Sequence, residues 1–182
     1  MNISIKKADF NKAMSKVRNF VAKDADRADL NFIRIEVIDK EAVFTALDGH
    51  RGIRHKCPCE IYGDGVFIGY IRPISLPAKG SQKVNLEHSD NITVVRYRGT
   101  YRENYIWEFD DAKDFFDLES ELLEPCRARD MSALFNTKLL KQSLSSFDKD
   151  VHIYVGTTPA KPWYFKSGNT EAVVLTSILK ED

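Results

Sequence analysis

One short segment of the chain alternates potential zinc ligands. His55, Cys57 and Cys59 are spaced two residues apart, so on a β-strand all three side chains would point to one face. Imidazole and thiolate groups bind zinc, and His50 or Cys126 could supply a fourth ligand. The spacing, however, differs from the two-residue gap of structural zinc knuckles. We therefore expect buried strand cysteines and neither a bound metal nor another cofactor.

Carboxylates form a second group with potential chemistry. Four aspartates lie between positions 110 and 117 and could bind a divalent cation, but the run lacks the glycine and the spacing of a calcium loop. Asp48 and His50 could exchange a proton, yet no serine or cysteine nucleophile signature accompanies them. We predict that the protein is not an enzyme and that the acidic run is a solvated connector.

The composition limits the setting in which these residues act. The chain has 182 residues, of which 43% are apolar and 30% are charged, as in an ordinary soluble globular domain. We expect no signal peptide, and no apolar run approaches the ~20 residues that cross a bilayer. Its three cysteines do not suggest a disulfide framework. We expect a cytoplasmic protein without a membrane partner.

Basic and acidic residues balance over the whole chain, with 27 of each, but not along it. Residues 1–100 contain 17 basic and 12 acidic residues, residues 101–125 contain two and nine, and residues 126–182 contain eight and six. The neutral total argues against a surface that binds nucleic acid everywhere. The segments instead allow basic faces separated by an acidic connector.

Hydrophobic periodicity predicts the elements that position these groups. Residues 1–62 have the pattern of a strand, a helix and three further strands. Asp9 is expected to cap the helix, whose apolar residues from Phe10 to Val21 recur at helical spacing. Asp39-Lys40 is an expected turn between strands. The strands are expected over residues 2–6, 32–37, 42–46 and 51–61.

The rest of the chain repeats this pattern with changes. Two prolines and a glycine between positions 73 and 80 leave no room for a helix in the next unit. Asn136 is a good N-cap for a later helix. That helix would turn inward Leu139, Leu140, Leu144 and Phe147. The strands are expected over residues 66–71, 83–87, 91–98, 105–109, 151–155, 163–166 and 171–178.

The repeated units define the expected fold and domains. We predict an α+β fold of repeated strand–helix–strand units, with antiparallel sheets and two main helices. Residues 1–125 would form one domain from two units, residues 1–62 with a helix and residues 63–125 with an eroded helix. Residues 126–182 would form a C-terminal half-domain.

Several stretches of the sequence share motifs with one known family. Phe44–Arg51 resembles an Ala-Thr-Asp-Gly-His-Arg signature, and Asp114–Leu118 resembles a Phe-Pro-Asp-Tyr segment. Phe135–Leu140, Val151–Val155 and Ala172–Leu175 resemble a C-terminal half-domain that follows them. The family is the beta subunit of bacterial DNA polymerase III, the sliding clamp. The resemblance implies a DNA-clamp-like fold, in a version about half the usual length. Two alternatives stay open: a ring closed by four copies, or a dimeric or monomeric clamp-like protein of phage or mobile-element origin.

In that family the helices line a ring around duplex DNA and present cations to its phosphates. Contacts to the backbone give affinity without reading the sequence, which suits sliding. A solvated helix face is the alternative interpretation, because lysines lie on such faces by default. The matching positions implied by the resemblance are Lys12, Lys16, Arg18, Lys23, Lys138 and Lys141.

The resemblance also implies a groove for short apolar peptides of partner proteins. The matching positions are Leu47, Gly49, His50, Arg51, Ile53, Phe116, Val173, Val174 and Leu175. Phe116 stands where the family has proline, Gly52 where it has leucine, and Leu175–Ile178 replaces a Met-Pro-Met-Arg ending. From the residues alone, Asp48-Gly49 could be only a hairpin turn and Val173–Leu175 only a core strand.

These implications lead to two functional hypotheses. The first is a sliding-clamp-like processivity or docking factor, a homo-oligomer that binds duplex DNA without sequence preference and docks replication or repair proteins through their peptides. The second is a protein-interaction module that keeps the clamp fold and the peptide groove but does not encircle DNA.

Overall fold

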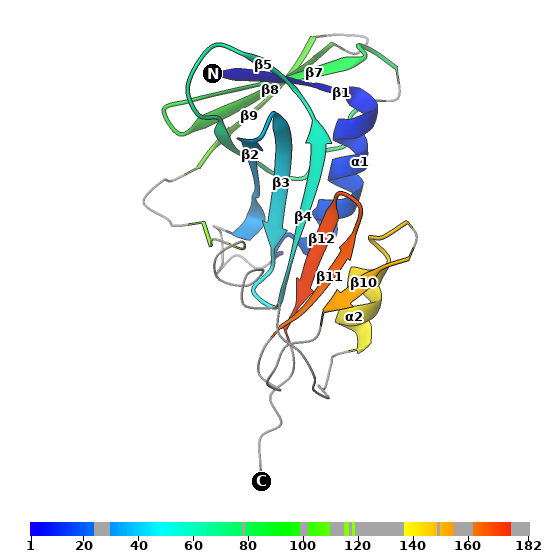
Figure 1. Cartoon of the computed structure of the whole chain (residues 1–182). Helices are drawn as coiled ribbons and strands as arrows, with labels where there is room; N and C mark the ends of the chain where they lie inside the picture. Colours follow the sequence, from blue (N-terminus) through cyan, green and yellow to red (C-terminus); the bar gives the residue numbers. More distant parts are fainter. Residues whose placement is uncertain are drawn as a thin grey trace.

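The computed structural model of the chain describes residues 1–23, 30–77, 79–98, 102–109, 115, 116, 118, 137–148, 150–154 and 162–175. These residues form two antiparallel β-sheets and two α-helices (Figure 1). The predicted α+β class with antiparallel sheets is therefore confirmed. Neither of the described helices is long and apolar enough to cross a bilayer.

The five-stranded sheet lies at the top of the molecule in Figure 1. Its strand order is β5 (Glu60–Tyr62), β1 (Asn2–Lys6), β7 (Lys83–Ser89), β8 (Ile92–Arg98) and β9 (Arg102–Glu108). Successive side chains alternate between its faces. Ile3, Ile5, Val84 and Leu86 are buried in the main core, whereas the residues between Val84 and Leu86 and on either side of them face outward.

The seven-stranded sheet joins strands from both ends of the chain. Its order is β10 (His152–Tyr154), β11 (Trp163–Ser167), β12 (Thr170–Val174), β4 (Arg51–Pro58), β3 (Glu41–Leu47), β2 (Ile33–Ile38) and β6 (Ile68–Ile71). Strand β12 pairs directly with β4. The sheet is therefore continuous between residues 1–125 and 126–182, and the expected boundary at residue 125 lies outside the described residues.

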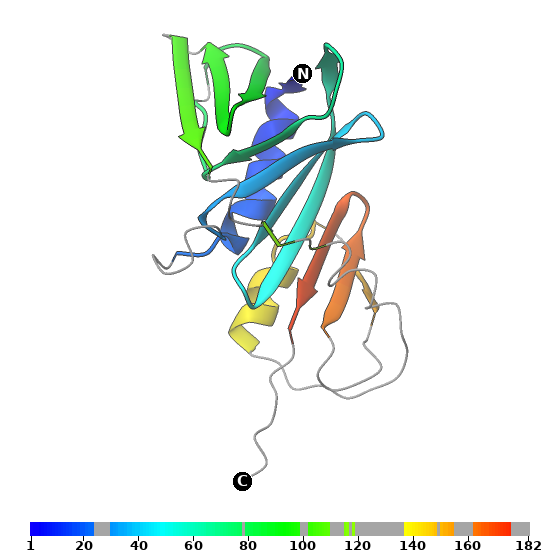
Figure 2. The ribbon, with the colours of Figure 1, turned by 90° about the vertical axis from the view of Figure 1, so that its left-hand side faces the viewer.

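Both helices pack on one face of the seven-stranded sheet. Helix α1 (Lys7–Val17) continues into the 3-10 turn η1 (Arg18–Phe20), and α2 is Thr137–Leu144. Figure 2 shows α1 beside β4 and α2 beside β12. The apolar stripe of α1 is buried in the main core, and Leu140 of α2 packs against the same core. We call this sheet face the inner face and the opposite one the outer face.

The predicted cap of the first helix is wrong. Helix α1 begins at Lys7, its N-cap is Lys6, and Asp9 lies inside the first turn. Lys6 makes no side-chain capping bond. The negative charge of Asp9 still favours the helix, because it lies near the positive end of the helix dipole. The predicted cap of α2, Asn136, lies outside the described residues.

The expected strand over residues 51–61 is divided between the two sheets. Strand β4 ends at Pro58 and β5 begins at Glu60, since proline has no N–H with which to continue a ladder. Residues 72–77 and 79–82 contain no helix, as the prolines predict. Strand β12 ends at Val174, and residues 176–178 of the expected last strand lie outside the described residues.

Candidate functional site

The turn between β3 and β4 is held by the Asp48 carboxylate. Its Oδ1 atom accepts hydrogen bonds from the backbone N–H groups of His50 and Arg51, both at 3.1 Å. Gly49 has a φ of 86°, the left-handed conformation that glycine adopts at little cost. Asp48 therefore serves the hairpin turn, the structural alternative that the sequence left open. The His50 side chain is exposed at the tip.

The Arg51 side chain points into the protein and away from the surface where a partner peptide was expected. Its Nε donates to Asp48 Oδ2 at 2.9 Å, and its Nη2 donates to the carbonyl of Asn19 at 2.7 Å. The guanidinium lies 4.7 Å from the centre of the Phe20 ring. With 7% of its surface exposed, Arg51 fixes η1 to the hairpin. Its expected role in contacting a peptide is not supported by this geometry.

Strand register divides the predicted peptide-groove residues between two faces. Leu47 is paired with Gly52, Gly52 with Val173, and Val173 with Tyr164. Directly paired residues share a face, so these four form one row across β3, β4, β12 and β11. We call it the outer row, because its residues lie on the face opposite the helices.

The neighbours of the outer row point to the inner face, because successive residues of a strand alternate. Ile53 is fully buried and Val174 is 1% exposed, both within the main core on the helix side of the sheet. These two expected peptide contacts are corrected: they are core residues. Leu175 continues the β12 ladder by donating its N–H to the carbonyl of His50 at 3.0 Å and is partly exposed.

A segment that follows β9 along the chain covers the outer row. Leu118 is 2% exposed and forms a small apolar cluster with Tyr164 and Val173. A β-carbon placed on Gly52 would lie 2.5 Å from Cδ1 of Leu118. Leu118 thus fills the space that a side chain at position 52 would occupy. The signal in the sequence was Gly52 itself, at the position where the clamp family has leucine.

Two phenylalanines precede Leu118. Phe115 packs at the other end of the outer row, against the cluster of Leu47, Ala22 and Leu30. Phe116, an expected peptide contact, is 37% exposed. We call Phe115, Phe116 and Leu118 the strap. Sequence reasoning named Phe116 but missed Phe115, Leu118 and Tyr164 as residues of this surface.

The predicted DNA-binding cations are exposed with one exception. The side chains of Lys12, Arg18, Lys23, Lys138 and Lys141 are exposed on or next to the two helices. Lys16 is not on the solvated face: its side chain is 8% exposed, and its Nζ lies 2.6 Å from Asp148 Oδ1. Lys16 adjoins the apolar stripe of α1, so its stem packs inward and its charge is compensated.

A cavity of about 340 Å³ lies between α1, β4 and the turn after β11. His55 lines this cavity; it is 5% exposed, and its Nδ1 lies 2.7 Å from the Thr170 hydroxyl. Burial, followed by the charges of Lys12 and Lys16, lowers the pKa of His55 to about 4. The imidazole is therefore neutral at pH 7.

Cys57 and Cys59, two of the potential zinc ligands, lie where burial disfavours the charged thiolate. Burial raises the pKa of Cys57 to about 12 and also raises the pKa of Cys59. Among the described residues, no cluster of three or more His, Cys, Asp or Glu side chains has the arrangement of a metal site. Cys126 and the aspartates at positions 110–117 lie outside the described residues.

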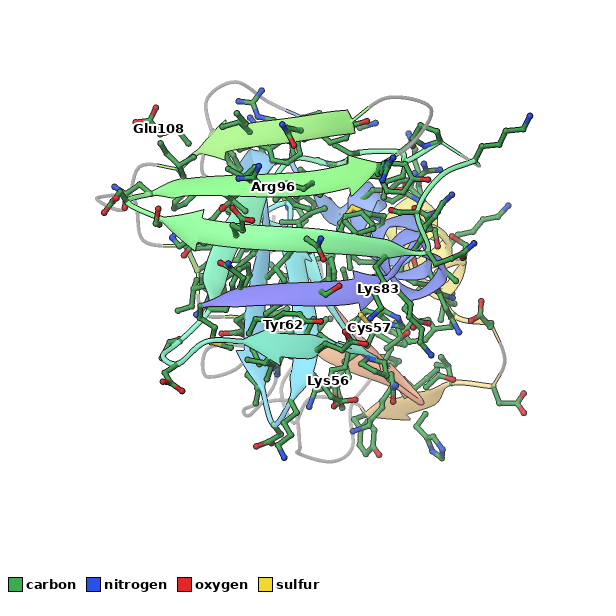
Figure 3. All side chains as sticks on the ribbon, turned by 90° about the horizontal axis from the view of Figure 1, so that it is seen from above. Lys56, Cys57, Tyr62, Lys83, Arg96 and Glu108 are labelled. Carbon is green, nitrogen blue, oxygen red and sulfur yellow. The ribbon has the colours of Figure 1, made fainter. Side chains whose placement is uncertain are left out.

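On the face of the five-stranded sheet that points away from the main core, Lys83 and Arg96 form ion pairs with neighbouring glutamates (Figure 3). Lys83 lies 2.7 Å from Glu60, and Arg96 makes two bonds to Glu87 at 2.8 and 3.0 Å. A depression of about 500 Å³ lies over strands β7, β8 and β9. Exposed pairs of this kind contribute little to stability, and their charges are already compensated.

Comparison with known proteins identifies the fold. No family model and no curated protein matches the sequence. The DNA polymerase sliding clamp of Bacillus subtilis matches 99% of this chain with a TM-score of 0.77 at 13% identity, over 65% of its own length. The Pseudomonas aeruginosa clamp matches 98% with a TM-score of 0.76 at 13% identity, over 67% of its own length.

A third solved structure, the Helicobacter pylori beta clamp bound to a DNA ligase peptide, matches 97% of the chain with a TM-score of 0.69 at 12% identity, over 66% of its own length. The chain therefore has the fold of a bacterial DNA polymerase sliding clamp, as the sequence motifs implied. It spans about two thirds of the length of the solved clamps that it matches.

Proposed function

We propose that this protein is a sliding-clamp-like processivity or docking factor without catalytic activity or a cofactor. The observation that carries the proposal is the match of nearly the whole chain to solved sliding clamps. The placement of exposed cations on both helices of one sheet face supports it. Residues 1–125 and 126–182 would act as a clamp domain and a half-domain in the cytoplasm.

Duplex DNA would be bound through its phosphates. Lys12 and Arg18 at α1, and Lys138 and Lys141 on α2, offer exposed cations on the two helices, and Lys23 follows η1. Lysine and arginine that contact phosphates release counterions, so binding is sensitive to salt but indifferent to sequence. Lys16 is left out of this surface, because its side chain is only 8% exposed and its Nζ lies 2.6 Å from Asp148 Oδ1.

Partner proteins would dock apolar peptides on the outer row. The row offers Leu47, Val173 and Tyr164 around the backbone of Gly52, and aliphatic and aromatic anchors suit such a surface. A homo-oligomer would supply the remaining units of a ring. The partners expected from the sequence are replication or repair proteins that carry a docking peptide.

A salt titration tests the DNA surface. Anisotropy of a fluorescent 30-base-pair duplex would be measured from 25 to 250 mM salt for wild type and for a variant with Lys12, Arg18, Lys138 and Lys141 replaced by Gln. Each lost phosphate contact reduces the slope of log K against log salt by ~0.9, so a reduction of about 3–4 is expected. An unchanged slope would contradict the helix-face assignment.

A matched variant controls for net charge. Lys6, Lys83, Arg96 and Arg98 lie on the outer face of the five-stranded sheet and are exposed. Replacing these four by Gln removes the same formal charge from a different surface. It is expected to leave the slope close to that of wild type. An equal loss in both variants would indicate a general charge effect and would contradict a defined interface.

A second candidate function is an interaction module of clamp fold that does not encircle DNA. The observation that favours it is the pairing of Lys16 with Asp148, which places an acidic group on the helix side. This candidate predicts a monomer or open dimer by light scattering and no preference for closed circular DNA. A closed ring retained on circular but not on linear DNA would exclude it.

A further inference from the structure

The strap places two apolar side chains on the outer row. Leu118 lies over the middle of the row, where its 2% exposure shows that it is covered on all sides. Phe115 lies three residues earlier and contacts the cluster at the Leu47 end. The chain thus covers, with an aromatic and an aliphatic anchor, the surface that the sequence motifs assign to partner peptides.

Gly52 makes the Leu118 contact possible. The nearest atoms to a β-carbon added at this position would be Cδ1, Cδ2 and Cγ of Leu118, at 2.5, 3.0 and 3.4 Å. Distances below 3.0 Å are not compatible with a real side chain, so any residue larger than glycine would move Leu118. The space over Gly52 is therefore filled by the Leu118 side chain, which packs with the apolar side chains of Tyr164 and Val173.

The Phe115 end of the contact is built from aromatic rings. The centre of the Phe115 ring lies 5.7 Å from that of Tyr70 and 6.5 Å from that of Phe109. Tyr70 and Phe109 stack on each other at 3.8 Å. An aromatic side chain at this end meets further rings in tilted and edge-on geometry, which stabilises aromatic clusters.

We propose that the outer row is a two-anchor site for a partner peptide with an aromatic residue followed three positions later by leucine, and that the strap is its resident occupant. A partner peptide binds by displacing Leu118 and Phe115 from the row. The inference rests on the proposed docking function and adds to it an internal competitor. Because the strap belongs to the same chain, its effective concentration at the outer row is high. A partner peptide can bind only those molecules in which the strap has left the row, so its apparent affinity is reduced in proportion to their fraction.

The probe is a fluorescent peptide with the sequence of residues 113–120, Lys-Asp-Phe-Phe-Asp-Leu-Glu-Ser. The full-length Leu118→Ala chain is expected to bind it at least tenfold more tightly than wild type, because the leucine position is vacant. A peptide with alanine in place of its leucine is expected to lose this gain. Equal affinity of the two chains, or of the two peptides for Leu118→Ala, would overturn the proposal.

Three further variants separate occupancy from stability. Leu86→Ala removes a leucine that is fully buried in the main core and is expected to leave probe binding at the wild-type level. Gly52→Ala/Leu118→Ala refills the vacated space with a β-carbon and is expected to bind the probe no better than wild type. Leu118→Val retains most of the buried surface and, should Leu118→Ala not fold, is expected to give a smaller gain of about threefold.

The probe experiment contains no DNA and no partner protein. A failure of the proposed DNA function therefore leaves its result unaffected. Conversely, if Leu118→Ala shows no gain while the salt slope depends on the helix cations, the internal competitor is excluded and the clamp proposal stands.

Discussion

The Nζ atom of Lys16 lies 2.6 Å from Oδ1 of Asp148 and connects α1 to the residues that follow α2. The two side chains differ in environment, with 8% of the lysine and 64% of the aspartate exposed. Lys12 approaches the same carboxylate at 4.0 Å. The hydrogen bond from Lys16 and the nearby charges lower the pKa of Asp148. Asp148 therefore compensates the charge of Lys16, whose aliphatic stem is buried against the core.

Asp148→Asn is expected to destabilise the fold by about 1–2 kcal/mol, because Lys16 would remain buried without its counter-ion. Urea denaturation at pH 7 measures the change in the free energy of unfolding. Lys16→Met/Asp148→Asn removes both charges while keeping the apolar stem and is expected to recover most of the loss. An Asp148→Asn chain as stable as wild type would show that the pair contributes nothing.

His55 is expected to make stability fall as pH decreases from 6.5 towards 4. Its pKa is lowered from 6.5 to about 4 by burial and then by Lys12 and Lys16, against an opposing effect of Asp148. Between these values the unfolded chain binds a proton that the folded chain does not. The free energy of unfolding should therefore decrease by ~1.4 kcal/mol per pH unit, about 3 kcal/mol over the window.

Thermal melts from pH 4 to pH 8 measure this dependence. His55→Gln keeps a hydrogen-bonding side chain but cannot titrate, so its melting temperature should vary less over the window. His50→Gln is the matched control, since His50 is exposed at a turn, and it should retain the wild-type profile. Identical pH profiles for His55→Gln and wild type would contradict the assignment.

Cys57 and Cys59 are expected to differ in reactivity towards iodoacetamide. The Cys57 thiol is 3% exposed and its pKa is raised to about 12, so at pH 8 it should react at least a thousandfold more slowly than a free cysteine. Cys59 is partly exposed and should react first. Mass spectrometry of digests locates the label, with guanidinium-denatured protein as the control. Labelling of Cys57 at the same rate as Cys59 would contradict this prediction.

Local patterns predicted most of the secondary structure. The helix over α1 follows from apolar residues at helical spacing, and the hairpins follow from alternation between turn residues. The same alternation shows that not all the expected peptide contacts can lie in one groove. Ile53 and Val174 each adjoin a residue of the outer row and must face the other way. A motif carried over by position does not by itself respect this alternation.

Other features required the tertiary structure. Lys16 borders the apolar stripe of α1, and only the position of Asp148 decides that its amine turns to that carboxylate. Leu118 is separated by most of the second unit from Gly52, and no local pattern connects the two. Gly52 indicated a missing side chain, but the residue that fills its space depends on the path of the chain after β9.

The turn between β2 and β3 offers a stabilising substitution. Ile38 pairs with Glu41, so Asp39 and Lys40 form a two-residue loop, with φ values of 52° and 65°. Such turns favour glycine at the second position, because a β-carbon in the left-handed conformation costs roughly 1 kcal/mol. Lys40→Gly should therefore raise the melting temperature by about 2–4 °C.

Lys40→Ala provides the matched control for this turn. It removes the same charge and stem as Lys40→Gly but keeps the β-carbon, so calorimetry should show little or no gain for it. The Lys40 carbonyl that accepts the Cys59 thiol at 3.6 Å is present in both variants, which excludes that contact as the source of a difference. Equal melting temperatures for the glycine and alanine variants would show that the left-handed conformation of residue 40 does not limit stability.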